Sequence, residues 1–189
     1  MKIRDSGMPE ESYWESFFDT QFIFSQLQFD NTITNAVEFG SGYGTFTIPA
    51  ARLIKGNLFA FDIEPEMVTI LGRKILKEKL SNVKIHQLDF VKEGTKLNDG
   101  SLDYAMFFNI LHAEEPISLL KEAYRILNTG GKVGVMHWIF STSTPRGPSM
   151  DIRPKPEQCI AWLEQAGFIL GSDIIFLPPY HYGIIGIKK

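Results

Sequence analysis

The stretch Val37-Glu38-Phe39-Gly40-Ser41-Gly42-Tyr43-Gly44 decides the fold of this chain. An apolar run from Ile33 to Phe39 leads into three glycines at alternate positions, and a pattern of helical spacing follows from Thr45 to Leu53. This order predicts a strand, a tight turn and a helix, because glycine allows sharp bends and close approach of the backbone to a ligand. Such a turn presents backbone N–H groups and a helix N-terminus at one point, which suits a nucleotide-type ligand.

The alternation of strand and helix continues to the C-terminus. Strands are predicted at Ile33–Phe39, Leu58–Phe61, Val83–Leu88, Leu102–Phe108, Lys132–Trp138, Ile169–Leu177 and Tyr180–Ile187. Helices are predicted at Thr45–Leu53, Glu64–Leu80, Glu115–Leu127 and Pro156–Ala166. These elements predict a doubly wound, Rossmann-like α/β sheet of seven strands. Only Pro178-Pro179 separates the last two strands, which is too short for a parallel crossover, so the last strand is expected to run antiparallel.

The segment before the first strand is unusually aromatic. Residues Pro9 to Gln28 carry apolar side chains at roughly helical spacing, and Pro9 followed by two glutamates suits a helix start. The length of 189 residues fits a single domain. We expect an extra N-terminal helix that forms a lid within residues 1–30, and a Rossmann-like core over 31–189. Tyr13 and Trp14 have polar tips and are candidate substrate contacts; packing of this helix on the sheet edge is the alternative.

The composition argues against several classes of function. A net charge of −3 gives no electrostatic reason to expect nucleic acid or an anionic membrane as a partner. No stretch approaches the ~20 apolar residues of a membrane span, and the first residues lack the apolar run of a secretory signal. The single cysteine, Cys159, excludes an internal disulfide and a cysteine-based zinc site. We therefore expect a cytoplasmic protein that requires no metal.

Further motifs follow the glycine-rich turn in a fixed order. They are Asp62 at the end of the second predicted strand, Asp89 after the third, the stretch Leu102–His112 around the fourth, and Leu127-Asn128-Thr129-Gly130-Gly131 before the fifth. With these motifs the chain resembles the class I S-adenosylmethionine-dependent methyltransferases, and within them the small-molecule branch that includes ubiquinone- and menaquinone-biosynthesis methyltransferases. The resemblance implies an enzyme that transfers the methyl group of S-adenosylmethionine to a small-molecule acceptor and releases S-adenosylhomocysteine.

The resemblance also assigns a cofactor site. Contacts are expected at Glu38, Gly40, Ser41, Gly42, Gly44, Asp62, Ile63, Met67, Asp89, Phe90 and Asn109. The glycines would approach the methionine and ribose parts of the cofactor, Asp62 would accept hydrogen bonds from the ribose hydroxyls, and Asp89 would accept one from the adenine amine. The residues alone leave other roles open. Glu38 could bond turn amides only, Asp62 could cap the next helix, and Asp89 could form a turn.

Two histidines and two arginines are candidates for catalysis and substrate binding. His112 and His137 follow or end the fourth and fifth strands, at the edge where open α/β sheets bind ligands. Either could take a proton from a nucleophile; alternatively each is structural, and transfer depends on positioning alone. Arg146 and Arg153 lie in an irregular stretch from Phe140 to Lys155, where they could bind an anionic substrate or remain solvated loop charges.

Two other classes of function remain open from the sequence. A nicotinamide-dependent oxidoreductase has a similar sheet, but Thr45 stands where the third glycine of its G-x-G-x-x-G fingerprint belongs. The expected antiparallel last strand also counts against that class. A relative that binds the cofactor without catalysis would keep the same glycines and aspartates, so these residues do not exclude it.

Overall fold

The computed structural model describes residues 7–189 and has the strand, turn and helix predicted around the glycines. The helices are α1 (Glu11–Glu15), α2 (Thr20–Gln26), α3 (Thr47–Leu53), α4 (Pro65–Lys77), α5 (Phe90–Glu93), α6 (Pro116–Ile126) and α7 (Pro156–Gln165). The strands are β1 (Ala36–Phe39), β2 (Leu58–Asp62), β3 (Val83–Gln87), β4 (Leu102–Phe108), β5 (Leu127–Trp138), β6 (Ile169–Leu170), β7 (Ile175–Leu177) and β8 (His181–Ile187).

One sheet contains all of these strands, in the order β3-β2-β1-β4-β5-β8-β6, with β7 also paired to β8. Strands β1 to β5 are parallel to their neighbours, whereas β8 runs antiparallel to β5. The doubly wound α/β sheet and its antiparallel last strand are therefore confirmed. The order reverses between β1 and β4, and a doubly wound sheet binds its ligand at this kind of switch point, beyond the carboxyl ends of the strands.

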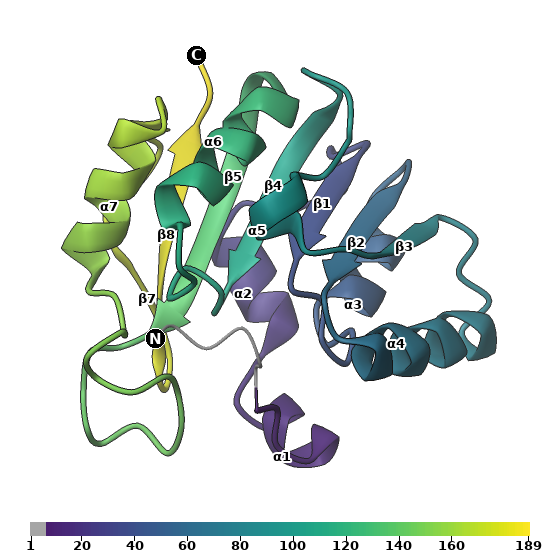
Figure 1. Ribbon diagram of the computed structural model, residues 1–189, viewed down its shortest axis with the longest axis horizontal. Coiled ribbons are helices and arrows are strands. Elements are labelled where there is room, and N and C mark those ends of the chain that lie inside the picture. The colour runs from purple at the N-terminus through teal and green to yellow at the C-terminus, as the bar shows by residue number, and fades with distance from the viewer. Residues whose placement is uncertain (1–6) are drawn as a thin grey trace.

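Helices cover both faces of the sheet (Figure 1). Residues along β4 alternate between two cores: Ala105 and Phe107 pack with residues of α6 and α7, whereas Tyr104 and Met106 pack with residues of α2 and α3. Because both faces are covered, the central strands are almost wholly apolar, as their sequence indicates. Burial on two sides fixes the register of β1 and β4, which in turn fixes where their carboxyl ends stand.

Four predicted elements differ from the structure, and one of them is β5, which begins at Leu127 rather than at Lys132. The single N-terminal helix is wrong: α1 and α2 are separate, because Asp19 accepts a hydrogen bond from Phe22 N–H and starts a second helix. The first strand begins only at Ala36, since the backbone N–H groups of Thr34 and Asn35 donate to the Asp103 carboxylate instead of to a strand. The predicted strand Ile169–Leu177 is two short pieces, β6 and β7, both paired with β8.

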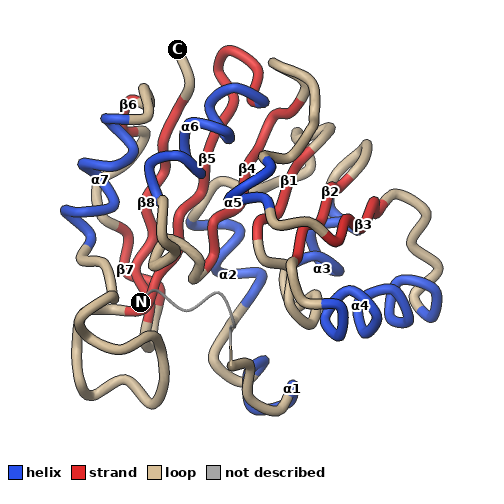
Figure 2. Tube along the Cα trace, viewed as in Figure 1, coloured by secondary structure: helices blue, strands red, loops and turns tan. Residues whose placement is uncertain are grey.

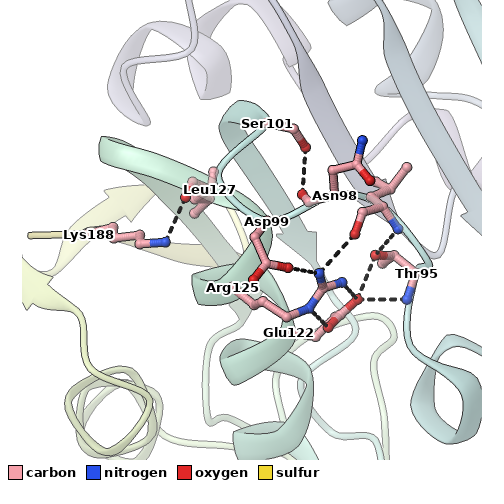
Figure 3. A network of polar contacts seen from close by, with 9 residues as sticks. Thr95, Asn98, Asp99, Ser101, Glu122, Arg125, Leu127 and Lys188 are labelled. Atoms are coloured by element: carbon pink, nitrogen blue, oxygen red, sulfur yellow. Dashed lines mark hydrogen bonds and ion pairs between the residues drawn. The ribbon is translucent and has the colours of Figure 1, made fainter.

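A polar network fastens the segment before β4 to α6 (Figure 3). The Arg125 guanidinium donates to Glu122, to Asp99 and to the carbonyl oxygen of Leu97. The Glu122 carboxylate also accepts from the N–H and the hydroxyl of Thr95, at 2.7 and 2.6 Å. These residues lie near the start of β4, so the network holds the end of the sheet opposite to the carboxyl ends of the strands.

The carboxyl ends of the parallel strands meet three irregular segments. The long connection between β5 and α7 and the short helix α1 both extend past this edge, at the bottom of the view in Figures 1 and 2. The glycine-rich turn lies at the same edge because it follows β1 directly. Within residues 7–189, no helix has the length and apolar character needed to cross a membrane.

Candidate cofactor site

The three glycines build the turn after β1. Their φ angles are +77° at Gly40, +51° at Gly42 and +82° at Gly44, in the left-handed region that glycine adopts without the cost of a Cβ. Asp62, at the end of β2, holds this turn. Its Oδ2 accepts from Gly42 N–H at 2.7 Å, and its Oδ1 accepts from Glu64 N–H at 3.0 Å. Each carboxylate oxygen retains a second lone pair, so Asp62 can orient the turn and still accept from a ligand hydroxyl.

Glu38 is buried directly behind the turn, with 2% of its surface exposed. Burial and the nearby negative charge of Asp62 raise the pKa of Glu38 to about 8, although the hydroxyl of Thr47 donates to its Oε2 and opposes the shift. The side chains that act on this carboxyl are thus a hydroxyl and a second carboxyl. A ligand cation beside it would offset the cost of ionising Glu38, and the amino group of an amino acid is such a cation.

A pocket lies next to the turn. It encloses about 490 Å³, counting the space at its mouth, and is lined by Ile63, Asp89, Phe90, Val91, Ile110, His112, Ala113 and Glu114. Ile110 links it to the turn, because its Cδ1 is 3.2 Å from the position that a Cβ on Gly40 would take. The structure therefore brings Ile63, Asp89, Phe90 and His112 together. Met67 is buried on α4 and does not line this pocket.

Asp89 has a second role besides lining the pocket. It is the N-cap of the one-turn helix α5, where it accepts from Lys92 N–H at 3.3 Å. Phe90 follows it and packs edge-on against Phe39 of β1, with ring centroids 5.3 Å apart. The sequence did not predict α5, which fixes the direction in which Asp89 and Phe90 leave the sheet.

The two predicted catalytic histidines contact each other. His137 Nε2 lies 3.4 Å from His112 Nδ1, and the rings meet edge-on. His137 is fully buried, and this burial together with the charges of His112 and His181 holds its pKa well below the usual value. His137 is therefore a neutral imidazole behind His112. Of these two histidines, only His112 lines the pocket, together with the predicted adenine contacts Asp89 and Phe90.

Asn109 and His181 form a polar contact at the end of β4. Asn109 has a left-handed φ of +58°, which is strained for a residue with a Cβ, and its Nδ2 lies 3.5 Å from His181 Nε2. His181 is 1% exposed, and burial lowers its pKa to about 3. No role for His181 was predicted. The antiparallel direction of the last strand was the available signal, because it puts the first residue of that strand at the carboxyl ends of the others.

The described N-terminal residues lie across the same edge. Met8 Cε is 3.4 Å from the position that a Cβ on Gly42 would take, and Tyr43 Oη donates to the Pro9 carbonyl at 2.8 Å. Lys74 of α4 pairs with Glu11 of α1. These contacts place the segment over the glycine-rich turn.

Aromatic rings continue this cover towards β5. Trp138, at the end of β5, has Trp14 and Phe17 at centroid distances of 6.4 and 5.3 Å. Phe17 is buried, whereas Tyr13 is 46% exposed and touches Phe17 edge-on. Tyr13 and Trp14, both predicted substrate contacts, thus stand at the rim of an aromatic cluster at the carboxyl end of β5.

The two loop arginines are engaged within the protein. Arg153 is 7% exposed, and its five N–H donors are directed at the carbonyls of Ile139, Ser141, Arg146 and Pro148 and at the hydroxyl of Thr144. Arg146 donates to the carbonyl of Gly7. Arg153 therefore organises the loop from inside, and Arg146 ties that loop to the N-terminal segment.

The buried polar atoms at this edge of the sheet indicate whether its residues fit S-adenosylmethionine. Within residues 7–189, Ser41 Oγ, Thr45 Oγ1 and Asn109 Oδ1 are buried without a hydrogen-bond partner. Such atoms are rare in folded proteins because each costs free energy. Ser41 and Thr45 belong to the turn and to the residue after it, where the polar amino-acid part of the cofactor is expected, and Asn109 follows β4 at the same edge. The apolar pocket is lined by the residues expected at adenine. The donors and acceptors present therefore suit this cofactor.

Comparisons with known proteins agree with this fit. A family profile described as a methyltransferase domain matches residues 36–131. Demethylmenaquinone methyltransferase of Lactobacillus johnsonii is 28% identical over 117 residues, which cover 60% of this chain and 46% of that protein. The chloroplastic 2-methyl-6-phytyl-1,4-hydroquinone methyltransferase of Arabidopsis thaliana is 29% identical over 136 residues, covering 70% and 39%. The chain spans about a fifth to a half of the length of the curated relatives it matches.

Solved structures share the fold. A SAM-dependent methyltransferase from Aquifex aeolicus superposes with a TM-score of 0.83 at 21% identity, over 95% of this chain and 94% of that one. Geranyl diphosphate C-methyltransferase from Streptomyces coelicolor, solved with S-adenosyl-L-homocysteine, gives 0.76 at 13% identity over 97% and 85%. Because the family profile covers half of the chain and the sheet has the predicted topology, the chain belongs to the class I S-adenosylmethionine-dependent methyltransferases.

Proposed function

We propose that this protein is an S-adenosylmethionine-dependent methyltransferase that acts on an apolar small-molecule acceptor. The observation that carries the proposal is the hydrogen bond that Asp62, at the end of β2, accepts from Gly42 N–H in the glycine-rich turn. The Asp62 carboxylate can still accept hydrogen bonds from a ligand. The pocket lined by Asp89 and Phe90 adjoins the glycine-rich turn, because Ile110 lines the pocket and also lies beside Gly40. Together they offer one continuous site for a nucleoside joined to an amino acid.

The chain's own residues bind, orient and exclude water. S-adenosylmethionine supplies a methyl group on a positively charged sulfur, which is already a good leaving group. Asp62 would hold the ribose, Asp89 and Phe90 the adenine, and Glu38, with the turn, the amino-acid end. Asn109 is a further candidate contact of the cofactor at the end of β4, and the aromatic cluster around Trp138 at the same edge would position the acceptor. Positioning and exclusion of water are then the main contributions of the protein, and no metal is needed.

The apolar character of the acceptor is proposed from the aromatic side chains beside the site. Trp14, Phe17 and Trp138 offer flat apolar surface, and the N-terminal segment would close over the bound molecules as a lid. The relatives that act on quinone-type molecules support this assignment. Other relatives carry RNA methyltransferase names, but the two matches cover only 36% and 43% of this chain. The net charge of −3 favours a small molecule over RNA.

Methyl transfer from labelled S-adenosylmethionine tests this function. The protein would be incubated with demethylmenaquinone, oxidised and reduced, and separately with total RNA. We expect label in the solvent-extracted quinone fraction and none in RNA. Asp62→Ala should weaken cofactor binding by ~2 kcal/mol or more, because charge-assisted hydrogen bonds are lost, and should lower transfer at limiting cofactor. Label in RNA alone would contradict the proposed acceptor class, and label with neither would contradict both named acceptors.

A further inference from the structure

We propose that a second pocket, between the β5–α7 connection and the start of α7, binds an organic anion with a flat apolar body. This cavity, which we call the loop pocket, encloses about 600 Å³, counting the space at its mouth. Pockets of this order of size hold small molecules in many proteins. The site would take a ligand other than the cofactor and the methyl acceptor, so its existence is independent of the proposed function.

The loop pocket lies apart from the cofactor pocket. Its lining comes from the end of the sheet, from the connection and from α7: Phe140, residues 150–155, Gln158 and Trp162. None of these residues lines the cofactor pocket, and in Figure 1 the start of α7 stands at the left, well away from α5. Gly147 packs against both Arg153 and Trp138, because a Cβ on it would lie 2.6 Å from Arg153 Nη2 and 2.9 Å from Trp138 Cγ. The loop pocket therefore borders the proposed acceptor region but is a cavity of its own.

Two aromatic rings give the loop pocket its apolar walls. The ring of Phe140 is 42% exposed, and Trp162 of α7 is half-buried. Met150, Ile152 and Pro154 complete the apolar lining. A flat apolar ligand would bury these side chains, and removing their surface from water stabilises the bound state.

The buried guanidinium of Arg153 makes the loop pocket positive. Arg153 is 7% exposed, and its N–H donors are directed only at neutral oxygens of its own loop. Within residues 7–189 it forms no ion pair. A buried charge without a counter-ion is costly, and burial accordingly lowers the pKa of Arg153. An anion in the pocket would stabilise this guanidinium through charge alone, because Arg153 has no donor to spare.

Lys155 supplies the donor that Arg153 lacks. It is exposed, and its Nζ lies 4.8 Å from the centre of the Phe140 ring. In the part of the chain that the structure describes, no carboxylate pairs with Lys155, and Asp151 is the one acidic residue of the lining. Two cations against one carboxylate favour an anionic ligand. An ammonium held over an aromatic wall can bind the anionic group while the ring contacts the apolar body.

NMR titration with 2-naphthoate tests whether the anion binds in the loop pocket. The chain has three tryptophans, and their indole N–H signals report on different places. Trp162 lines the loop pocket, whereas Trp14 and Trp138 belong to the aromatic cluster. We expect 2-naphthoate to shift the signal of Trp162, assigned with Trp162→Phe, and to leave that of Trp14 in place. A shift of Trp14 without one of Trp162 would overturn the inference, and so would no shift up to the solubility limit.

Matched ligands and variants test the role of charge. Neutral 2-naphthylmethanol and cationic 2-naphthylmethylammonium carry the same rings, and we expect each to bind at least about fivefold more weakly than 2-naphthoate. Lys155→Gln should weaken 2-naphthoate binding by about two- to fivefold, the size of an exposed ion pair, and Lys155→Glu should weaken it further. Lys121→Gln, on the exposed side of α6, removes the same charge elsewhere and should bind like the natural protein. Equal affinity for the anion and the cation, or unchanged affinity in Lys155→Glu, would overturn the inference.

Calorimetric titration with S-adenosylhomocysteine, with and without 2-naphthoate, tests whether the two sites are separate. We expect the same affinity for S-adenosylhomocysteine in both titrations, because the two pockets share no lining residue. Competition between the two ligands would overturn the placement of the anion in the loop pocket. A shift of Trp162 by 2-naphthoate together with no binding of S-adenosylhomocysteine would instead refute the proposed function and leave the loop pocket standing.

Discussion

Glu38 is a buried carboxyl whose raised pKa predicts how the stability of the protein depends on pH. Its pKa is raised to about 8 in the folded protein from an ordinary value of 4.5. The folded state therefore binds more protons than the unfolded chain between these values, and the free energy of unfolding falls as pH rises through this window. Glu38→Gln, which cannot ionise, should remove much of the slope and should be more stable than the natural protein at pH 9, by roughly 1–4 kcal/mol. Urea unfolding at pH 5, 7 and 9 measures this. Asp62, whose pKa burial also raises, contributes a residual slope of the same sign. Parallel curves for the two proteins would show that Glu38 ionises without cost.

Helix α6 and the segment before β4 supply a prediction at the scale of elements. Burial opposes ionisation of Glu122, but hydrogen bonds from Arg125 and Thr95 outweigh it and lower the pKa to about 2. A lowered carboxyl pKa gives stability that is present above the unfolded value, near 4.5, and is lost as pH falls towards 2. Glu122→Gln should therefore reduce the free energy of unfolding at pH 7 by ~1–3 kcal/mol, and the difference should shrink in acid. Glu164→Gln, on the exposed side of α7, is the matched control. Because the network holds the opposite end of the sheet from the glycine-rich turn, affinity for S-adenosylhomocysteine should not change. Equal stability of the two variants at pH 7 would contradict this account.

At the scale of the whole molecule, the sequence predicted the sheet far better than its surroundings. The topology was predictable because strands buried on both faces are long apolar runs, and because two prolines cannot carry a parallel crossover. The N-terminal helix was predicted as one piece because its apolar spacing continues across Asp19, whose side chain caps the start of α2. The sequence could name His112 and His137 but not their contact, because that contact depends on the register of β5 beside the loop after β4. Arg153 is the reverse case. Its charge suggested a ligand, yet its donors satisfy the carbonyls of its own loop, a use that only the folded loop reveals.

Calorimetric titration of the purified protein with S-adenosylhomocysteine, beside NAD and the Gly42→Val variant, tests the central claim most directly. We predict micromolar binding of S-adenosylhomocysteine and no binding of NAD. Gly42→Val should fold but not bind, because φ at Gly42 is +51° and an added side chain would enter the space beside Met8. Binding of NAD, absence of S-adenosylhomocysteine binding, or unchanged affinity in folded Gly42→Val would contradict the placement of the cofactor on this turn.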